Sequence, residues 1–206
     1  MNVLLVNGSP RRNGNTARAL DEIAAALDAR GVASETFWPG PRPVHGCAAC
    51  GACHATPGRC AFDDDPANAL SDAFARADAF VIGSPVYYGQ PNGALLALVQ
   101  RACYSNSAAV AGKPCATLAV CRRGGATAAF QCLNMPFQML DCLVVGSQYW
   151  NVAYGAAPGE TALDAEGLQT LRRLADNLAW LLSALRAPGV PPRPPREPRT
   201  PTNFIR

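Results

Sequence analysis

VLLVNGSPRRNGNT, at residues 3–16, predicts how this chain begins to fold. Val3 to Val6 is an unbroken apolar run, typical of a buried parallel strand, and Asn7-Gly8-Ser9-Pro10 then predicts a turn. From Thr16 to about Arg30, apolar residues recur at helical spacing, so a helix follows at once. A strand, a glycine-containing turn and a helix in this order indicate the first unit of a parallel α/β sheet.

The same alternation continues along the chain and predicts one α/β domain. Further strands are expected at about 33–38, 79–83, 115–121 and 143–147, and further helices at about 64–76, 91–104, 126–140 and 163–185. Such units cross over with a right hand, so they build a doubly wound parallel sheet of five strands with helices on both faces. We assign residues 1–187 to this domain.

Residues 188–206 differ from the rest because prolines and arginines alternate there. Such a segment favours an extended polyproline II chain. Two interpretations of this C-terminal extension stay open. It is either a flexible tail or an arm that lies along a partner subunit, helped by the apolar Phe204-Ile205.

Composition excludes several classes of protein. The chain has 206 residues, 49% apolar and 16% charged residues and a net charge of +3. These values do not fit a disordered protein, and the charge is too small for a nucleic-acid binder. No apolar run approaches the ~18 residues of a membrane span, and MNVLLVNGSP lacks the features of a secretory signal. We therefore expect a cytoplasmic protein without a nucleic-acid partner or a membrane span.

The first turn has the residues of a phosphate site. It lies where ligands bind in open parallel sheets, between a strand and the N-terminus of the next helix, for which Asn15 or Thr16 is the expected N-cap. The spacing does not match a Walker A loop or the dinucleotide fingerprint G-x-G-x-x-G. A monophosphate, as in flavin mononucleotide (FMN), is the remaining interpretation. The candidate phosphate ligands are Ser9, Arg11, Asn13, Asn15 and Thr16.

Three strand-end loops together carry a resemblance to a known family. They are GSPRRNGNT after the first strand, SPVYYGQPNG after the third and CRRGG after the fourth. The chain resembles the NAD(P)H-dependent FMN reductase and iron–sulfur flavoprotein group, over residues 1 to about 185. The resemblance implies a flavodoxin-like sheet with strand order 2-1-3-4-5, FMN as cofactor, NAD(P)H as co-substrate and a homodimer or homotetramer.

The resemblance also implies which residues contact the flavin ring. After the third strand these are Pro85, Val86, Tyr87, Tyr88 and Gly89. After the fourth strand they are Arg122, Arg123, Gly124 and Gly125, where an arginine beside the flavin would stabilise the negative charge of the reduced ring. The sequence does not tell which of the two arginines points inward. No residue is assigned as catalytic, since the flavin itself takes the hydride.

Four of the nine cysteines lie close together in the Cys-rich loop 45–63. Their spacing, Cys47-x2-Cys50-x2-Cys53-x6-Cys60, is typical of ferredoxin-type loops, whereas zinc sites more often use two separated CxxC pairs. Iron–sulfur flavoproteins carry a compact motif of this form. A [4Fe–4S] cluster, cysteines without metal, and zinc are the three alternatives, with Cys47, Cys50, Cys53 and Cys60 as ligands in the first and third.

The leading hypothesis is an FMN-dependent NAD(P)H oxidoreductase that passes electrons to a quinone, a flavin or another small acceptor. The alternative is an iron–sulfur flavoprotein or a flavodoxin-like electron carrier that exchanges electrons with a ferredoxin-like protein. The slightly basic charge counts against an ordinary flavodoxin. A regulatory protein whose thiol loop senses metal or redox state is a third class, which no residue positively requires.

Overall fold

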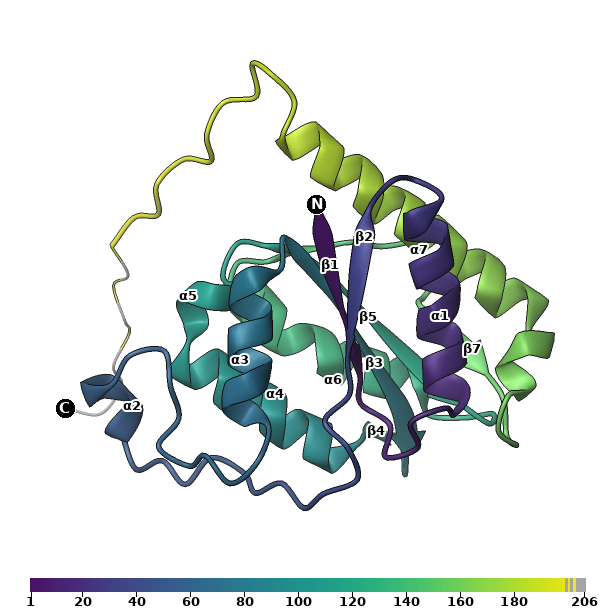
Figure 1. The fold of residues 1–206 in the computed structure, drawn as a ribbon, viewed down its shortest axis with the longest axis horizontal. Coiled ribbons are helices and arrows are strands. Elements are labelled where there is room, and N and C mark those ends of the chain that lie inside the picture. Colours follow the sequence, from purple (N-terminus) through teal and green to yellow (C-terminus); the bar gives the residue numbers. More distant parts are fainter. Residues whose placement is uncertain (199, 201, 203–206) are drawn as a thin grey trace.

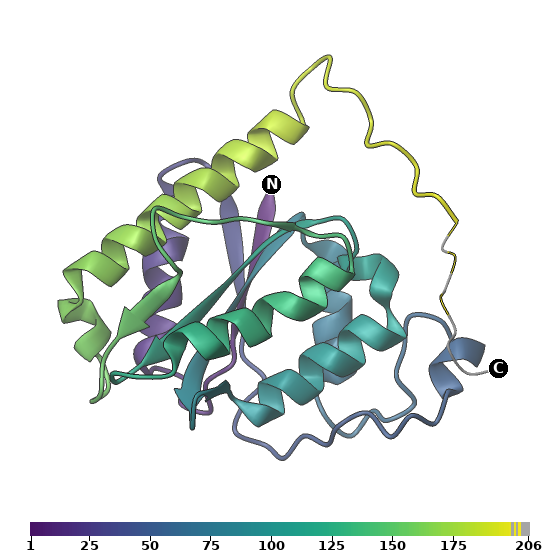
Figure 2. The ribbon, with the colours of Figure 1, turned by 180° about the vertical axis from the view of Figure 1, so that it is seen from behind.

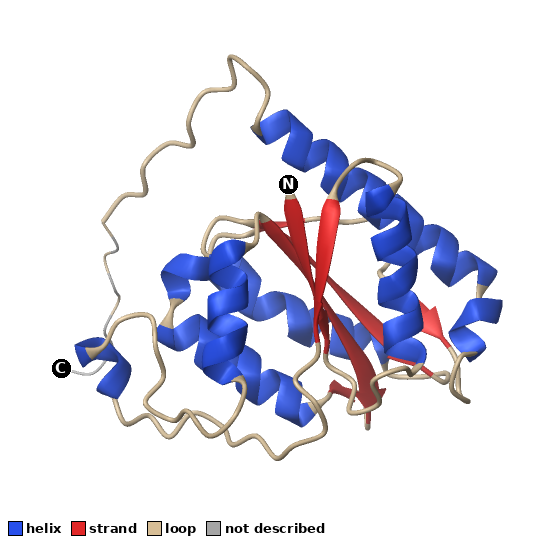
Figure 3. Ribbon diagram, viewed as in Figure 1, coloured by secondary structure: helices blue, strands red, loops and turns tan. Residues whose placement is uncertain are grey.

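A twisted parallel sheet forms the centre of the molecule (Figure 1 and Figure 3). The computed structural model describes residues 1–198, 200 and 202. The main strands run in the order β2-β1-β3-β5-β6, and all their pairs are parallel. Their bounds are β1 Asn2–Asn7, β2 Ala33–Phe37, β3 Ala79–Tyr87, β5 Pro114–Cys121 and β6 Leu143–Val144. The predicted flavodoxin-like fold class and strand order are confirmed.

Helices cover both faces of the sheet. On one face lie α1 and α7, and on the other lie α3, α4 and α6, as the two opposite views show (Figure 1 and Figure 2). β1 supplies both cores by strand alternation, since Val3 and Leu5 join the first and Leu4 and Val6 join the second. The helices are α1 Asn15–Asp28, α2 Ala52–Ala55, α3 Ala67–Arg76, α4 Gly93–Ser105, α5 Ser107–Val110, α6 Ala126–Met139 and α7 Ala165–Leu185, with the 3-10 turn η1 Glu160–Leu163.

The fifth strand position differs from the prediction of one strand at 143–147. Two short segments share it, because β6 pairs with the start of β5 and β7 (Val152–Tyr154) pairs with its end. Residues 145–151 leave the sheet between them. The carboxyl edge of this position therefore lies after Tyr154, about seven residues later than the sequence indicates.

The loop predicted after the third strand is partly a hairpin. β3 continues to Tyr87 and pairs with β4 (Gln90–Pro91), and Tyr88 and Gly89 at the tip both have positive φ, as in a type I′ turn. Pro91 therefore belongs to β4 and does not begin the helix. Asn92 caps α4 instead, because its Oδ1 accepts from the backbone N–H of Ala94 and Leu95.

The third helix also begins later than predicted, at Ala67 and not at residue 64. Asp65, which lies just before this helix, turns inward and pairs with Arg101. The other end of α3 is held by Lys113, the only lysine of the chain. Its Nζ donates to the carbonyl oxygens of Phe74 at 2.5 Å and Ala77 at 2.7 Å, and its burial lowers its pKa.

The described part of the C-terminal extension is extended and contacts its own chain. Arg193 and Arg196 both pair with the carboxylate of Asp141, at 2.6 and 2.9 Å. Arg196 also donates to the carbonyl of Leu140, just beyond α6. A polyproline II chain turns every three residues, so the two arginines share one side of it. The predicted role of Phe204-Ile205 lies outside the described residues.

Candidate functional site

The loops after β1 and β3 meet because the backbones of their strands end together. Asn7 is opposite Gly83 in the sheet, and the Gly8 N–H donates to the Gly83 carbonyl at 2.8 Å. A Cβ atom at Gly8 would lie 2.3 Å from Leu95 Cδ2 and 2.8 Å from that carbonyl oxygen. Only glycine leaves room for this contact, so Gly8 allows the loop after β1 to pack directly against β3 and α4.

Side chains hold the first loop in a defined shape. The buried Asn7 accepts from the Ser9 N–H at 3.1 Å through Oδ1 and donates to the Arg12 carbonyl at 3.0 Å through Nδ2. The indole Nε1 of Trp38 donates to the Ser9 carbonyl at 2.8 Å, and Arg12 lies over the indole ring. Sequence reasoning missed Asn7 and Trp38. Asn7 could have been found, since an Asn two residues before a Ser often bonds its backbone.

The N-terminus of α1 has no side-chain cap. Its N-cap residue is Gly14, not Asn15 or Thr16 as predicted. The Asn15 amide is engaged elsewhere, because Nδ2 donates to the Ala157 carbonyl at 2.9 Å and Oδ1 accepts from the Thr161 N–H at 3.2 Å. The first N–H groups of α1 thus keep their capacity to bind an anion, which the positive end of the helix dipole favours.

A cavity opens at this helix end, at the carboxyl edge of the sheet. It is lined from four loops, and the residues are Ser9, Arg11, Gly14, Asn15, Thr16, Pro85, Val86, Tyr87, Val120, Cys121, Arg122, Gly155 and Ala156. Eight of them were candidates from the sequence: four phosphate-loop residues, three from the second loop and Arg122. The structure brings these eight together around one space.

The other six candidates do not line this cavity. They are Asn13, Tyr88, Gly89, Arg123, Gly124 and Gly125. Tyr88 and Gly89 form the hairpin tip, and the Tyr88 side chain is fully exposed. Gly125 has a supporting role: a Cβ there would lie 2.7 Å from the Gly89 Cα, so it allows the second and third loops to pack.

Gly155 and Ala156 enter the cavity from the loop after β7, which the sequence did not indicate. The sequence would have indicated these two residues only if it had shown that the fifth strand position ends at Tyr154. The carboxylate of Glu160 accepts from the N–H groups of Ala156 and Ala157 at 2.7 and 2.9 Å, and these bonds lower its pKa.

Cys121 also lines the cavity, and burial raises the pKa of its thiol, so it is a poor nucleophile at neutral pH.

A second, smaller cavity collects all four cysteines of the Cys-rich loop. Besides Cys47, Cys50, Cys53 and Cys60 it is lined by Arg101, Tyr104 and Ser105 from the last turns of α4, among others. Asn68 holds Cys60 from both sides, since it accepts from the Cys60 N–H at 2.8 Å and donates to its carbonyl at 3.0 Å. Among the described residues, no three cysteine sulfurs lie within 4.8 Å of one another.

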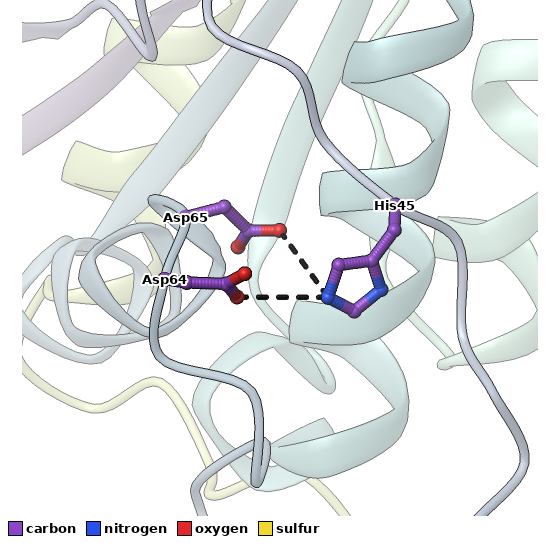
Figure 4. A group of neighbouring side chains, drawn as sticks. All are labelled: His45, Asp64 and Asp65. Atoms are coloured by element: carbon purple, nitrogen blue, oxygen red, sulfur yellow. Dashed lines mark ion pairs between the residues drawn. The ribbon is translucent and has the colours of Figure 1, made fainter.

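His45, Asp64 and Asp65 form a polar cluster beside this cavity (Figure 4). The imidazole Nε2 of His45 lies 3.6 Å from an Asp64 oxygen and 4.0 Å from an Asp65 oxygen. Asp65 is already neutralised by the buried guanidinium of Arg101, which would repel a second cation. We interpret the cluster as a polar contact between the two ends of the Cys-rich loop.

Comparison with known proteins gives a family. The model of the NADPH-dependent FMN reductase family matches residues 1–157. The chain belongs to this family. The match covers the loops after β1, β3 and β5 and the Cys-rich loop. Membership in the FMN reductase family supports FMN as the cofactor and flavin-dependent oxidoreduction as the class of reaction.

Individual relatives agree with the family. An iron–sulfur flavoprotein of Methanocaldococcus jannaschii is 28% identical over 196 residues, which are 90% of this chain and 100% of that protein. Two solved structures, RosB with a bound flavin-type intermediate and a flavodoxin from the domain Archaea, match with TM-scores of 0.67 and 0.60. Both are 15% identical and cover 90% and 89% of this chain, and 80% and 99% of their own. They support the fold of this FMN reductase family member.

Among the described residues, no helix is long and apolar enough to span a membrane.

The internal bonds of the loop after β1 predict the effect of Asn7→Ala. The substitution removes two hydrogen bonds, each worth about 1 kcal/mol, that hold this loop in its shape. We expect roughly tenfold weaker binding of FMN, measured by quenching of flavin fluorescence on titration with apoprotein. Asn177→Ala, which removes an exposed bond to Gly146 on another surface, is the control. An unchanged FMN affinity for Asn7→Ala would show that the loop keeps its shape without that side chain.

Proposed function

We propose that this chain is an FMN-dependent oxidoreductase that binds FMN in the cavity between the β1, β3, β5 and β7 loops. The uncapped N-terminus of α1, which faces this cavity beside Ser9 and Arg11, is the observation that carries the proposal. Its backbone N–H groups and the Ser9 and Thr16 hydroxyls would bind the phosphate. Asn15 would act indirectly, by tying the loop at Ala157 and Thr161 to the start of α1.

The ring of FMN would lie against residues 85–87, with Arg122 beside it. Arg122 lines the cavity and Arg123 does not, so the structure favours Arg122 as the residue that faces the negative charge of the reduced ring. FMN supplies the hydride acceptor when bound, and the chain supplies position and electrostatics. We propose NAD(P)H as the electron donor and a quinone, another flavin or another small molecule as the acceptor, supported by the description of the family.

A second candidate, an iron–sulfur flavoprotein, is favoured by the cavity that all four cysteines line. A zinc ion with Zn–S bonds of ~2.3 Å would draw its thiolates to within ~4 Å of one another. Among the described residues, no three cysteine sulfurs lie within 4.8 Å of one another, so the cysteines are not arranged for a single zinc ion. A [4Fe–4S] cluster held by these cysteines would transfer single electrons. The name of the Methanocaldococcus relative supports the same proposal.

For this second candidate we propose a ferredoxin-like protein as the partner that exchanges electrons with the cluster. For either candidate we propose a homodimer or homotetramer as the working assembly, as the resemblance implies. The C-terminal extension, residues 188–206, would remain an appendage of the single domain 1–187.

The proposed reaction is tested with the purified protein under anaerobic conditions. We expect a yellow protein whose flavin absorbance is bleached by NADPH or NADH and restored by a quinone. Stoichiometric bleaching by either nucleotide supports hydride transfer from NAD(P)H. If FMN binds but neither nucleotide bleaches it, while a reduced ferredoxin does, the electron-carrier function replaces the reductase. A colourless protein that FMN does not reconstitute contradicts both.

The position of Arg122 predicts a change in the flavin potential. Arg122→Gln removes a positive charge beside the ring, so the reduced, negatively charged form loses stabilisation. We expect the two-electron midpoint potential of bound FMN to fall by about 30 mV, measured by equilibration with a redox dye. Arg123→Gln removes an identical charge one residue away and outside the cavity, and it serves as the matched control. Equal shifts in the two variants would mean that neither arginine is specific to the ring.

The cysteine cavity predicts an effect on iron alone. After anaerobic reconstitution with iron and sulfide, wild type should hold close to four irons per chain. Cys50→Ser and Cys53→Ser should lose most of this iron and the broad visible absorbance, while FMN content stays unchanged because the two cavities share no residue. Cys132→Ser, in α6, is the control. An iron content per chain equal to that of wild type in the Cys50 and Cys53 variants would contradict the assignment of these cysteines as cluster ligands.

A further inference from the structure

A buried arginine contacts the Cys-rich loop at one of its cysteine sulfurs. Arg101, on α4, is 1% exposed. Its Nε–H and one Nη2–H both point to the Sγ of Cys60, each at 3.4 Å. The remaining N–H groups reach the Asp65 carboxylate and the carbonyl oxygens of His45 and Phe62. All five donors of the guanidinium therefore have acceptors, and two of them share one sulfur.

The guanidinium of Arg101 fixes the position of the Cys60 sulfur. Its fork is planar and rigid, so two N–H groups that share one sulfur define both the distance and the direction of that atom. Asp65 is 3% exposed in its side chain and balances the charge of Arg101. A Cys60 sulfur bound to iron would keep both N–H groups as donors, because the sulfurs of iron–sulfur clusters accept hydrogen bonds.

Ser105 provides an independent observation in the same cavity. The residue is 9% exposed, and its Oγ is buried without a hydrogen-bond partner among the described residues. It lies four residues after Arg101, so the two share one face of α4. The backbone carbonyl of Ser105 accepts from Gly58 at 2.9 Å. A buried hydroxyl without a partner is costly, and an acceptor inside the cavity would satisfy it.

We propose that Arg101 and Ser105 are positioning residues that hold Cys60 and donate hydrogen bonds to the sulfur atoms of an iron–sulfur cluster, raising its reduction potential. This inference rests on the iron–sulfur candidate proposed above. Reduction adds negative charge to a cluster, so a nearby buried cation and N–H···S bonds favour the reduced form. One helix face would thus set the position of the fourth ligand and the potential of the cluster.

The test is a potentiometric titration of the reconstituted, FMN-loaded protein, followed by electron paramagnetic resonance of the reduced cluster. For Arg101→Met we expect at least a tenfold lower ratio of reduced to oxidised cluster at a fixed potential, which is 59 mV for one electron. Arg101→Lys keeps the charge without the fork and should give a smaller fall. Ser105→Ala should shift the potential in the same direction.

Two matched controls and a rescue variant separate this role from a structural one. Arg59→Met removes an exposed positive charge directly beside Cys60, and Ser107→Ala removes an exposed hydroxyl just beyond α4. Neither should move the potential. Because Arg101→Met removes the buried cation that pairs with Asp65, Arg101→Met/Asp65→Asn is made alongside it. FMN content reports folding in every variant, since the flavin cavity lies elsewhere.

The outcomes are distinct. A wild-type cluster whose potential is unchanged in Arg101→Met, its rescue variant and Ser105→Ala overturns the role of this helix face and leaves the iron–sulfur function standing. Failure of wild type to assemble any cluster overturns both. Loss of the cluster with full FMN content in both Arg101 variants supports the positioning of Cys60, and Arg101→Lys and Ser105→Ala then provide the potentials.

Discussion

The parallel pairing of β1, β3 and β5 is the constraint on which the candidate flavin site depends. Asn7 lies opposite Gly83, and Pro85 lies opposite Val120, so the chain leaves each strand at nearly the same level. The close approach of Gly8 to the Gly83 carbonyl then sets the first loop against β3. As a result, the N-terminus of α1 and the loops after β3 and β5 face one space.

One helix joins the two cavities. α4 begins beside the flavin cavity, where Leu95 packs against Gly8, and it ends at the cysteine cavity with Arg101 and Ser105. Its 13 residues span about 20 Å. A displacement of this helix would therefore alter both the phosphate loop and the surroundings of Cys60. The cap at Asn92 and the buried Arg101–Asp65 pair fix its two ends.

Much of the fold could be predicted from the sequence, because periodicity reports which faces are buried. The sequence misplaced features that depend on tertiary contacts. The fifth strand position is split because β5 pairs with two segments, which local pattern does not reveal. Asn15 has the chemistry of a phosphate ligand or a helix cap, yet the 157–161 loop takes its side chain. Arg101 resembled any helical arginine, since its partners lie 36 to 56 residues away.

The single lysine has a practical consequence for chemical labelling. Nearly all the positive charge of this sequence is arginine, so Lys113 is the one side-chain amine in it that amine-reactive reagents and crosslinkers can modify. The Nζ of Lys113 is bound to carbonyl groups at the end of α3. Acylation there would require that junction to open, so its rate reports local opening between α3 and β5. A Lys113 that stays unmodified in the folded protein and reacts after denaturation is the signature of a closed junction.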